Sequence, residues 1–113
     1  MANLTTHSIG GKVIKDDDTY RIIDNGQLKN LILSQTVLHP NRQTRGHRHT
    51  GQEEIYFFVA GTGKMIVGNE TDAPFSVTAG DVVIIPDGDF HQVINDHEID
   101  LVFNCVFNGS RNY

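Results

Sequence analysis

The amino-acid sequence predicts an all-β protein, a sandwich or barrel made of one domain. Helical periodicity is nearly absent, and short runs rich in β-branched and aromatic residues follow one another along the 113 residues. Between these runs stand the turn sequences DNGQ, GTG, GNETDAP, AGD, PDGD and NDHE, which supply Gly, Asn, Asp or Pro where the chain must reverse. Many short strands with regular turns are typical of sandwiches and barrels.

Each expected strand is a β-rich run between two such turns. The strands are expected at residues 19–24, 29–39, 46–50, 53–61, 63–69, 75–79, 81–86, 91–96 and 99–108. The three aspartates at 16–18 precede the first of them and predict a solvated turn. The runs IYFFV and VVII are apolar on both faces, although a small closed barrel has only one inner face. The outer face therefore needs a second sheet layer or another subunit, and we expect a homodimer.

Composition limits the class of protein. Hydrophobic residues make up 38% and charged residues 20% of the chain, as in ordinary soluble domains. The net charge of -5 and the absence of a Lys/Arg cluster argue against nucleic-acid binding, and no apolar run is long enough to span a membrane. The N-terminus lacks the features of a secretory signal, and the single cysteine, Cys105, suits a reducing compartment. These features predict a cytoplasmic protein in which Cys105 is a small buried hydrophobe.

The stretch HRHTGQEEIYFF, residues 47–58, is either a polar loop that holds two histidines or half of a metal site. His47 and His49 are two residues apart, so an extended chain places both imidazoles on one face. A carboxylate from the next strand would complete the set. Glu54 shares a strand face with Tyr56 and Glu53 lies on the other face, so only one of them can point into a barrel. Two imidazoles and one carboxylate would bind a first-row divalent ion with open coordination positions.

A second stretch, GDVVIIPDGDFHQVIN at residues 80–95, adds another histidine. Gly80 opens a buried strand, and Gly88 follows a proline in a tight turn where it can take a positive φ. His91 then begins the next strand. A lone histidine of this kind is more often a satisfied core residue, and the combination of His91 with the first stretch is what favours a metal site.

The two stretches resemble the two signature motifs of the cupin superfamily. The residues that match the first motif are His47, His49, Glu54 and Gly61, and those that match every defined position of the second are Gly80, Pro86, Gly88, His91 and Asn95. Asn41 stands where the first motif has a glycine. Asn tolerates left-handed backbone better than other non-glycine residues, so the turn is expected to survive. The resemblance covers roughly residues 30 to 108.

This resemblance implies a double-stranded β-helix, or jelly-roll barrel, with residues 1–113 as a single cupin domain. Its core barrel would span about 30–108, after an N-terminal extension at 1–29. The resemblance selects Glu54 over Glu53 and implies one divalent metal ion bound by His47, His49, Glu54 and His91. Manganese, iron, zinc, nickel, copper and cobalt all occur in such sites, and three nitrogens with one oxygen do not choose among them.

Small one-domain cupins with this layout resemble the mannose-6-phosphate isomerase-like group. The resemblance implies a metal-dependent isomerase or epimerase whose small-molecule substrate is a sugar or sugar phosphate. Two alternatives remain open, namely an iron-dependent dioxygenase and a non-catalytic metal-dependent protein that binds a small ligand. Fold membership does not decide among them.

Further residues are candidates for the chemistry. Tyr56 shares a face with Glu54 and could donate a proton, or it could be a wall of the barrel. Arg42 and Arg45 precede the histidines and could bind a phosphate or carboxylate, and Lys64 could point inward after its turn. All three cations could equally be solvated surface residues. Behind His91, a hydrogen bond from Asn95 or Gln92 would be typical of metal sites.

Overall fold

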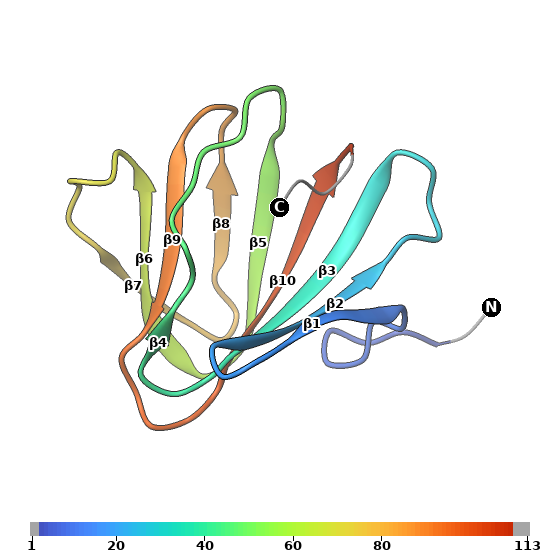
Figure 1. Cartoon of the computed structure of the whole chain (residues 1–113), viewed down its shortest axis with the longest axis horizontal. Helices are drawn as coiled ribbons and strands as arrows, with labels where there is room; N and C mark the ends of the chain where they lie inside the picture. The colour runs from blue at the N-terminus through green and yellow to red at the C-terminus, as the bar shows by residue number, and fades with distance from the viewer. Residues whose placement is uncertain (1–2, 110–113) are drawn as a thin grey trace.

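A computed structural model describes residues 3–109 as an all-β fold of ten strands (Figure 1). The strands are β1 (Lys12–Asp16), β2 (Tyr20–Asn25), β3 (Leu31–Leu38), β4 (Arg42–Gln43), β5 (Glu54–Ala60), β6 (Thr62–Gly68), β7 (Phe75–Thr78), β8 (Val82–Ile85), β9 (Phe90–Asn95) and β10 (Leu101–Asn108). No helix occurs within residues 3–109, and hence none that could cross a membrane.

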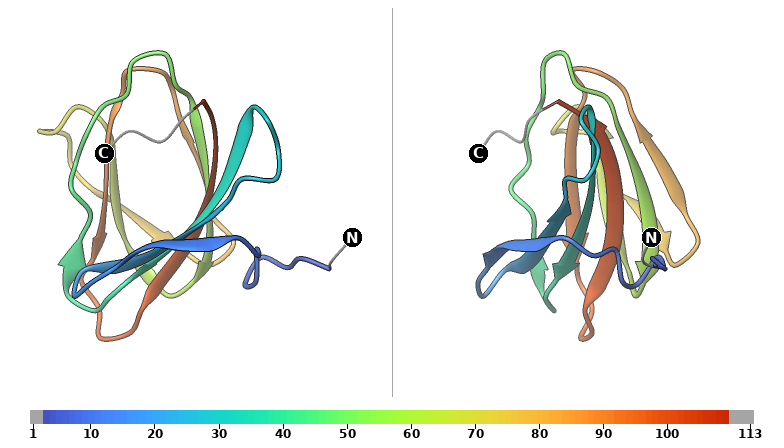
Figure 2. Two further views of the ribbon diagram at one scale, coloured as in Figure 1. Left: turned by 45° about the vertical axis from the view of Figure 1, so that its right-hand side comes forward. Right: turned by 90° about the vertical axis from the view of Figure 1, so that its right-hand side faces the viewer.

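The strands form two antiparallel sheets that face each other (Figures 1 and 2). One sheet has six strands in the order β1-β2-β3-β10-β5-β8, and the other has four in the order β4-β9-β6-β7. Between β3 and β10 the chain changes sheet at every connection except the one between β6 and β7. This alternation closes the two sheets into a jelly-roll barrel, as the sequence predicts.

The barrel interior is built by alternate side chains of each strand. On β5, Tyr56 and Phe58 are buried, and on β10 the inward residues include Phe103 and Cys105. Cys105 lies in the apolar core as expected. The outward residues of β5 and β8 remain exposed.

We call these outward residues the outer strip: Ile55, Phe57, Val82 and Ile84, with exposed fractions of 37%, 38%, 56% and 61%. They are neighbours across the two strands, because Ile55 pairs with Ile84 and Phe57 with Val82. Nothing in residues 3–109 buries this strip. The structure therefore has the apolar outer face that the sequence predicts.

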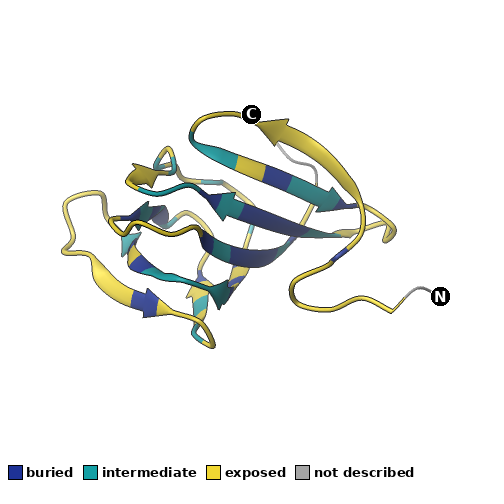
Figure 3. Cartoon of the chain, turned by 90° about the horizontal axis from the view of Figure 1, so that it is seen from below, coloured by how far each residue is buried: buried dark blue, intermediate teal, exposed yellow. Residues whose placement is uncertain are grey.

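Three elements differ from the sequence-based expectation. Residues 46–50 are not a strand, because only an isolated bridge joins His47 to His91. The two-residue β4 falls in an expected turn. Strand β1 has no counterpart among the expected strands, and all five of its residues are exposed (Figure 3), so it lacks the alternation that marks a half-buried strand.

Three turns lie where the sequence predicts them. Asn41 has φ 58° and Gly88 has φ 84°, so both take the left-handed conformation. In the aspartate run, Asp17 forms the turn between β1 and β2. Its Oδ1 accepts hydrogen bonds from the amides of Thr19 (2.8 Å) and Tyr20 (3.0 Å).

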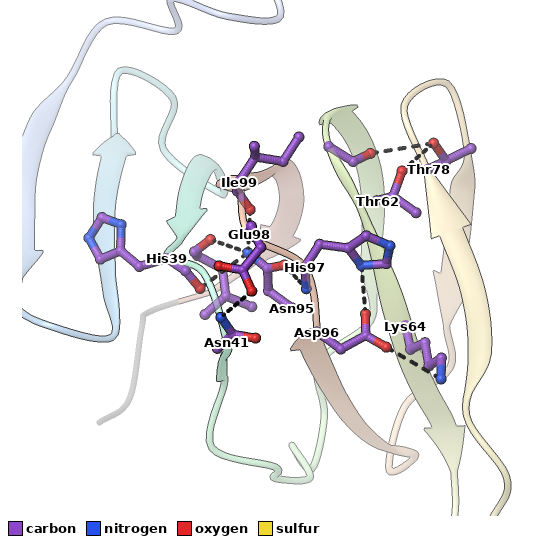
Figure 4. A network of polar contacts seen from close by, with 12 residues as sticks. His39, Asn41, Thr62, Lys64, Thr78, Asn95, Asp96, His97, Glu98 and Ile99 are labelled. Carbon is purple, nitrogen blue, oxygen red and sulfur yellow. Dashed lines mark hydrogen bonds and ion pairs between the residues drawn. The ribbon is translucent and has the colours of Figure 1, made fainter.

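Asn95 makes side-chain hydrogen bonds that stabilise the end of the barrel where β9 leads into β10 (Figure 4). Its side-chain amide donates to the carbonyls of Leu38 (2.9 Å), His39 (3.1 Å) and Ile99 (2.8 Å). Asn95 is 1% exposed, so these bonds satisfy a buried amide and join the end of β9 to residues 38–39 and to the loop before β10. The residue therefore holds the barrel together rather than supporting His91.

Candidate metal site

Three histidines converge inside the barrel. His47 and His49 lie in the segment between β4 and β5, and His91 lies on β9. The backbones of His47 and His91 exchange two hydrogen bonds, of 3.3 and 3.1 Å. One ring nitrogen from each of the three lies within 4.8 Å of those of the other two. This cluster could hold a metal ion.

Hydrogen bonds to backbone carbonyls orient two of the rings. His47 Nδ1 lies 2.9 Å from the carbonyl oxygen of Arg45, and His91 Nδ1 lies 3.3 Å from that of Asp89. A carbonyl only accepts, so each Nδ1 carries the proton and each Nε2 offers a lone pair. His91 Nε2 is buried and has no hydrogen-bond partner within the described chain. A buried nitrogen with a free lone pair suits a metal ligand.

Glu54 adds a carboxylate to the three imidazoles. Its side chain is buried, with Oε1 3.3 Å from His49 Nε2 and 3.8 Å from His91 Nε2. Glu53 is exposed instead. Three nitrogens and one oxygen fit a first-row divalent ion such as manganese, iron, nickel or zinc.

His91 is held neutral by its surroundings. Burial, with the nearby His47 as a second cause, lowers its pKa from 6.5 to about 4. The neutral imidazole is the form that binds metals, so this ligand needs no deprotonation at neutral pH.

The turn at residues 86–88 positions the first pair of histidines. The Gly88 amide donates to the His49 carbonyl (3.0 Å), and Asp87 Oδ1 accepts from the Gly51 amide (2.7 Å). Arg48 donates to the carbonyls of Gly68 and Gly88, so its guanidinium points away from the histidine cluster, as the alternation of side chains predicts.

Gly46 is a positioning residue that the sequence patterns did not single out. A β-carbon there would lie 2.2 Å from the ring of Phe90, which is itself buried. The segment can approach β9 closely only because this residue has no side chain. The same approach brings His47 to His91.

His47, His49 and Glu54 line a cavity of about 870 Å³, and His91 lies behind them. The six-stranded sheet contributes Ser34, Thr36, Tyr56 and Cys105 to the lining. The Tyr56 ring stacks on Phe103 at 5.1 Å and meets the His91 ring edge-on at 6.0 Å. The volume suits a small organic ligand.

The expected substrate-binding cations are not all at this cavity. Arg45 lines it, whereas Arg42 and Lys64 do not. Lys64 forms an ion pair with Asp96 (3.3 Å), beside the Asn95 network (Figure 4). Lys15, on the strand that the sequence did not predict, does line the cavity.

The polar residues that follow His91 do not support its ring. Gln92 donates to the carbonyl of Thr44 (2.9 Å) and so holds the segment that leads to His47. Asn95 binds backbone at the far end of its strand, as described above. Behind His91, the ring Nδ1 donates instead to the Asp89 carbonyl.

The chain belongs to the cupin domain family, whose model matches residues 34–107. The all-β cupin fold expected from the sequence is thereby confirmed. Membership of the mannose-6-phosphate isomerase-like group is not confirmed.

Two curated relatives are each 32% identical to this chain. One is the "Uncharacterized protein MJ1618" of Methanocaldococcus jannaschii, similar over 65% of this chain and 56% of its own length. The other is the "Oxalate-binding protein" of Thermotoga maritima, similar over 66% of this chain and 60% of its own. The chain therefore matches less than two thirds of the length of either relative.

A solved structure agrees on the fold. It is an uncharacterized conserved protein with a double-stranded β-helix domain from Klebsiella pneumoniae, 18% identical, with a TM-score of 0.74. The similarity covers 85% of this chain and 82% of that one.

Proposed function

We propose that this cupin binds a small organic acid through a divalent metal ion held by His47, His49, Glu54 and His91. The observation that carries the proposal is the buried, unpartnered Nε2 of His91, which faces the two other imidazoles and a carboxylate. A metal ion bound there would supply Lewis acidity and open positions for carboxylate oxygens.

The surroundings support an acidic ligand. Arg45 brings a permanent positive charge to the same cavity. The relative from Thermotoga maritima is named for oxalate binding, and its similarity of 32% extends over two thirds of this chain. Glu54 is the one carboxylate that lines the cavity among residues 3–109, so few negative charges would repel an acid.

The test combines metal analysis with ligand binding. The protein is stripped, reloaded separately with manganese, nickel, zinc and ferrous ion, and assayed for bound metal. Acetate and oxalate should raise the melting temperature of the loaded protein but leave the stripped protein unchanged. The His47→Ala, His49→Ala double variant should lose both the metal and the ligand effect. An acid that raises the melting temperatures of the stripped and the loaded protein equally would contradict the proposal.

A second candidate is the isomerase or epimerase expected from the sequence. It is favoured by Tyr56, whose side chain lines the cavity beside His91 and could exchange a proton with a sugar or sugar phosphate. Such an activity converts one sugar isomer into another, which NMR detects, and any uptake of deuterium from D2O would show that the transferred proton exchanges with solvent. Loaded protein that interconverts sugars, and loses turnover as Tyr56→Phe, would favour this candidate over simple binding. An iron-dependent dioxygenase would instead consume oxygen with ferrous ion, which an oxygen electrode measures.

We also propose that two copies of the chain cover the outer strip. Its four apolar side chains are 37% to 61% exposed, and burying apolar area stabilises association. Light scattering at micromolar concentration should give twice the chain mass, and Phe57→Asp should give a monomer that keeps its metal. A monomeric wild-type protein would contradict the pairing. The cytoplasmic location expected from the sequence stays a prediction for cell fractionation.

A further inference from the structure

The cavity has a wall that the family match does not include. The match begins at residue 34, whereas Lys15, Tyr20 and Ile22 also line the cavity. They come from the hairpin of β1 and β2, which extends the six-stranded sheet next to β3. This part of the site therefore lies outside the residues that the family model matches.

A β-bulge turns Lys15 toward the cavity. Val13 pairs with Ile23, but Lys15 pairs with Ile22, so one extra residue stands in β1 between these two pairs. Side chains of directly paired residues share a face of the sheet. Ile22 is buried and lines the cavity, and Lys15 lies on the same face.

Without the extra residue, the pairing set by Val13 and Ile23 would continue with Lys15 against Arg21. The lysine would then share the opposite face of the hairpin with another cation. A bulge that re-aims one side chain is a common device beside functional sites.

The ammonium group of Lys15 is held in place by Tyr20. Nζ lies 3.5 Å from the Tyr20 hydroxyl oxygen and 5.1 Å from the centre of its ring. Tyr20 itself is only partly exposed and packs against the apolar core. Lys15 is thus exposed, but its ammonium group lies beside Tyr20 at the edge of the cavity.

A second cation faces the hairpin. A shallow hollow of about 450 Å³ adjoins the cavity and shares both Lys15 and Arg45 with it. The hollow is lined by the β1–β2 turn on one side and by residues 43–46 on the other, and this turn lies beside β4 in Figures 1 and 2. Arg45 and Lys15 therefore lie on opposite sides of one opening to the cavity.

One negative charge lies near these cations. Asp17 lines the shallow hollow, and its carboxylate accepts hydrogen bonds from the amides of Tyr20 and Thr19, which lower its pKa, as does the charge of Lys15. Within residues 3–109, however, no carboxylate lies within 4.0 Å of the charged groups of Lys15 or Arg45. Neither cation is therefore held in a direct ion pair there.

We propose that the N-terminal hairpin selects ligands with two anionic groups. This inference rests on the proposed function: the metal site takes one acidic group, and Lys15, with Arg45, takes the second. The ligand class is then a small diacid, or an acid with a phosphate, in preference to a monoacid of the same length. Lys15 is a specificity-determining residue, and Tyr20 is a positioning residue that acts through it.

The experiment compares matched acids on zinc-loaded protein by titration calorimetry. The pairs are propanoate with malonate, butanoate with succinate, and pentanoate with glutarate, with oxalate as a reference. The wild type should bind at least one diacid tenfold or more tightly than its monoacid partner. Lys15→Met should remove most of that ratio while changing monoacid affinity less than twofold, and Arg45→Met should weaken diacid binding more than monoacid binding. Lys15→Arg should restore part of it.

A matched control lies on the same strand. Lys12→Met removes an equal charge from β1 at a position that does not line the cavity, and it should keep the wild-type ratio. Tyr20→Phe keeps the ring and should cost less than Lys15→Met. In amide spectra of the zinc-loaded protein, the preferred diacid should shift residues 15–22, and its monoacid partner should not.

The outcomes separate the two proposals. Monoacids that bind in a metal-dependent way, without preference for any diacid, would overturn the hairpin inference and leave the proposed function standing. A Lys15→Met variant that behaves like Lys12→Met would do the same. Zinc-loaded protein that binds neither monoacids nor diacids would overturn both.

Discussion

Lowering the pH should destabilise the metal-free protein through His91. An unperturbed histidine has a pKa of 6.5, whereas the pKa of His91 in the folded protein is about 4, chiefly because burial disfavours the imidazolium. Between these values the unfolded chain takes up a proton that the folded chain does not. The contribution of His91 is therefore fully favourable above pH 6.5 and is lost as the pH falls toward 4.

The size of the effect follows from the two pKa values. At about 1.36 kcal/mol per pKa unit, the interval from 6.5 to about 4 corresponds to about 3 kcal/mol of unfolding free energy, of which about 2 kcal/mol is lost by pH 5. Urea unfolding of stripped protein across this range measures it, with His91→Gln as the variant that cannot titrate there. Subtracting the unfolding free energies of His91→Gln from those of the wild type at each pH leaves the contribution of His91. Parallel pH profiles for the two proteins would refute the reasoning.

Three further predictions test other residues of the site and the barrel. Gly46→Ala should lower both the melting temperature and the affinity for zinc, because the added methyl meets a buried ring at 2.2 Å, whereas Gly26→Ala, with open space around it, should change neither. Glu54→Gln should weaken zinc binding by about 10- to 100-fold, and the neighbouring Glu53→Gln should leave it unchanged; equal effects in a competition titration would remove Glu54 from the donor set. Asn95→Ala leaves three carbonyls without their donor and should cost about 3 kcal/mol of unfolding free energy, while a simultaneous loss of zinc affinity in the folded variant would contradict its purely structural role.

Much of the barrel could be predicted because its strands alternate between core and surface. The alternation along β5 puts Glu54 and Glu53 on opposite faces, and the structure buries the first and exposes the second. Asn41 could likewise be assigned to a left-handed turn from its residue type alone. These inferences depend only on local backbone geometry.

The features that could not be predicted depend on pairing between distant segments. Residues 46–50 have a strand-like sequence, but only a single bridge joins them to β9. Their position depends on Gly46, which fits against the ring of Phe90 far along the chain. Lys15 carries no local signal, since its orientation follows from the register of β1 against β2. Nor does residue type tell whether Lys64 faces the cavity or an acidic neighbour, here Asp96.

The bulge in β1 has a consequence for how such a site can diverge. Its extra residue is the reason that Lys15, rather than its neighbour, faces the ligand side of the hairpin. Loss or gain of one codon in this stretch would exchange the whole set of side chains presented to the ligand, while the barrel and the histidines stay untouched. If the hairpin selects the ligand as proposed, ligand preference can therefore change through a one-residue insertion or deletion at this edge of the sheet, separately from the metal site.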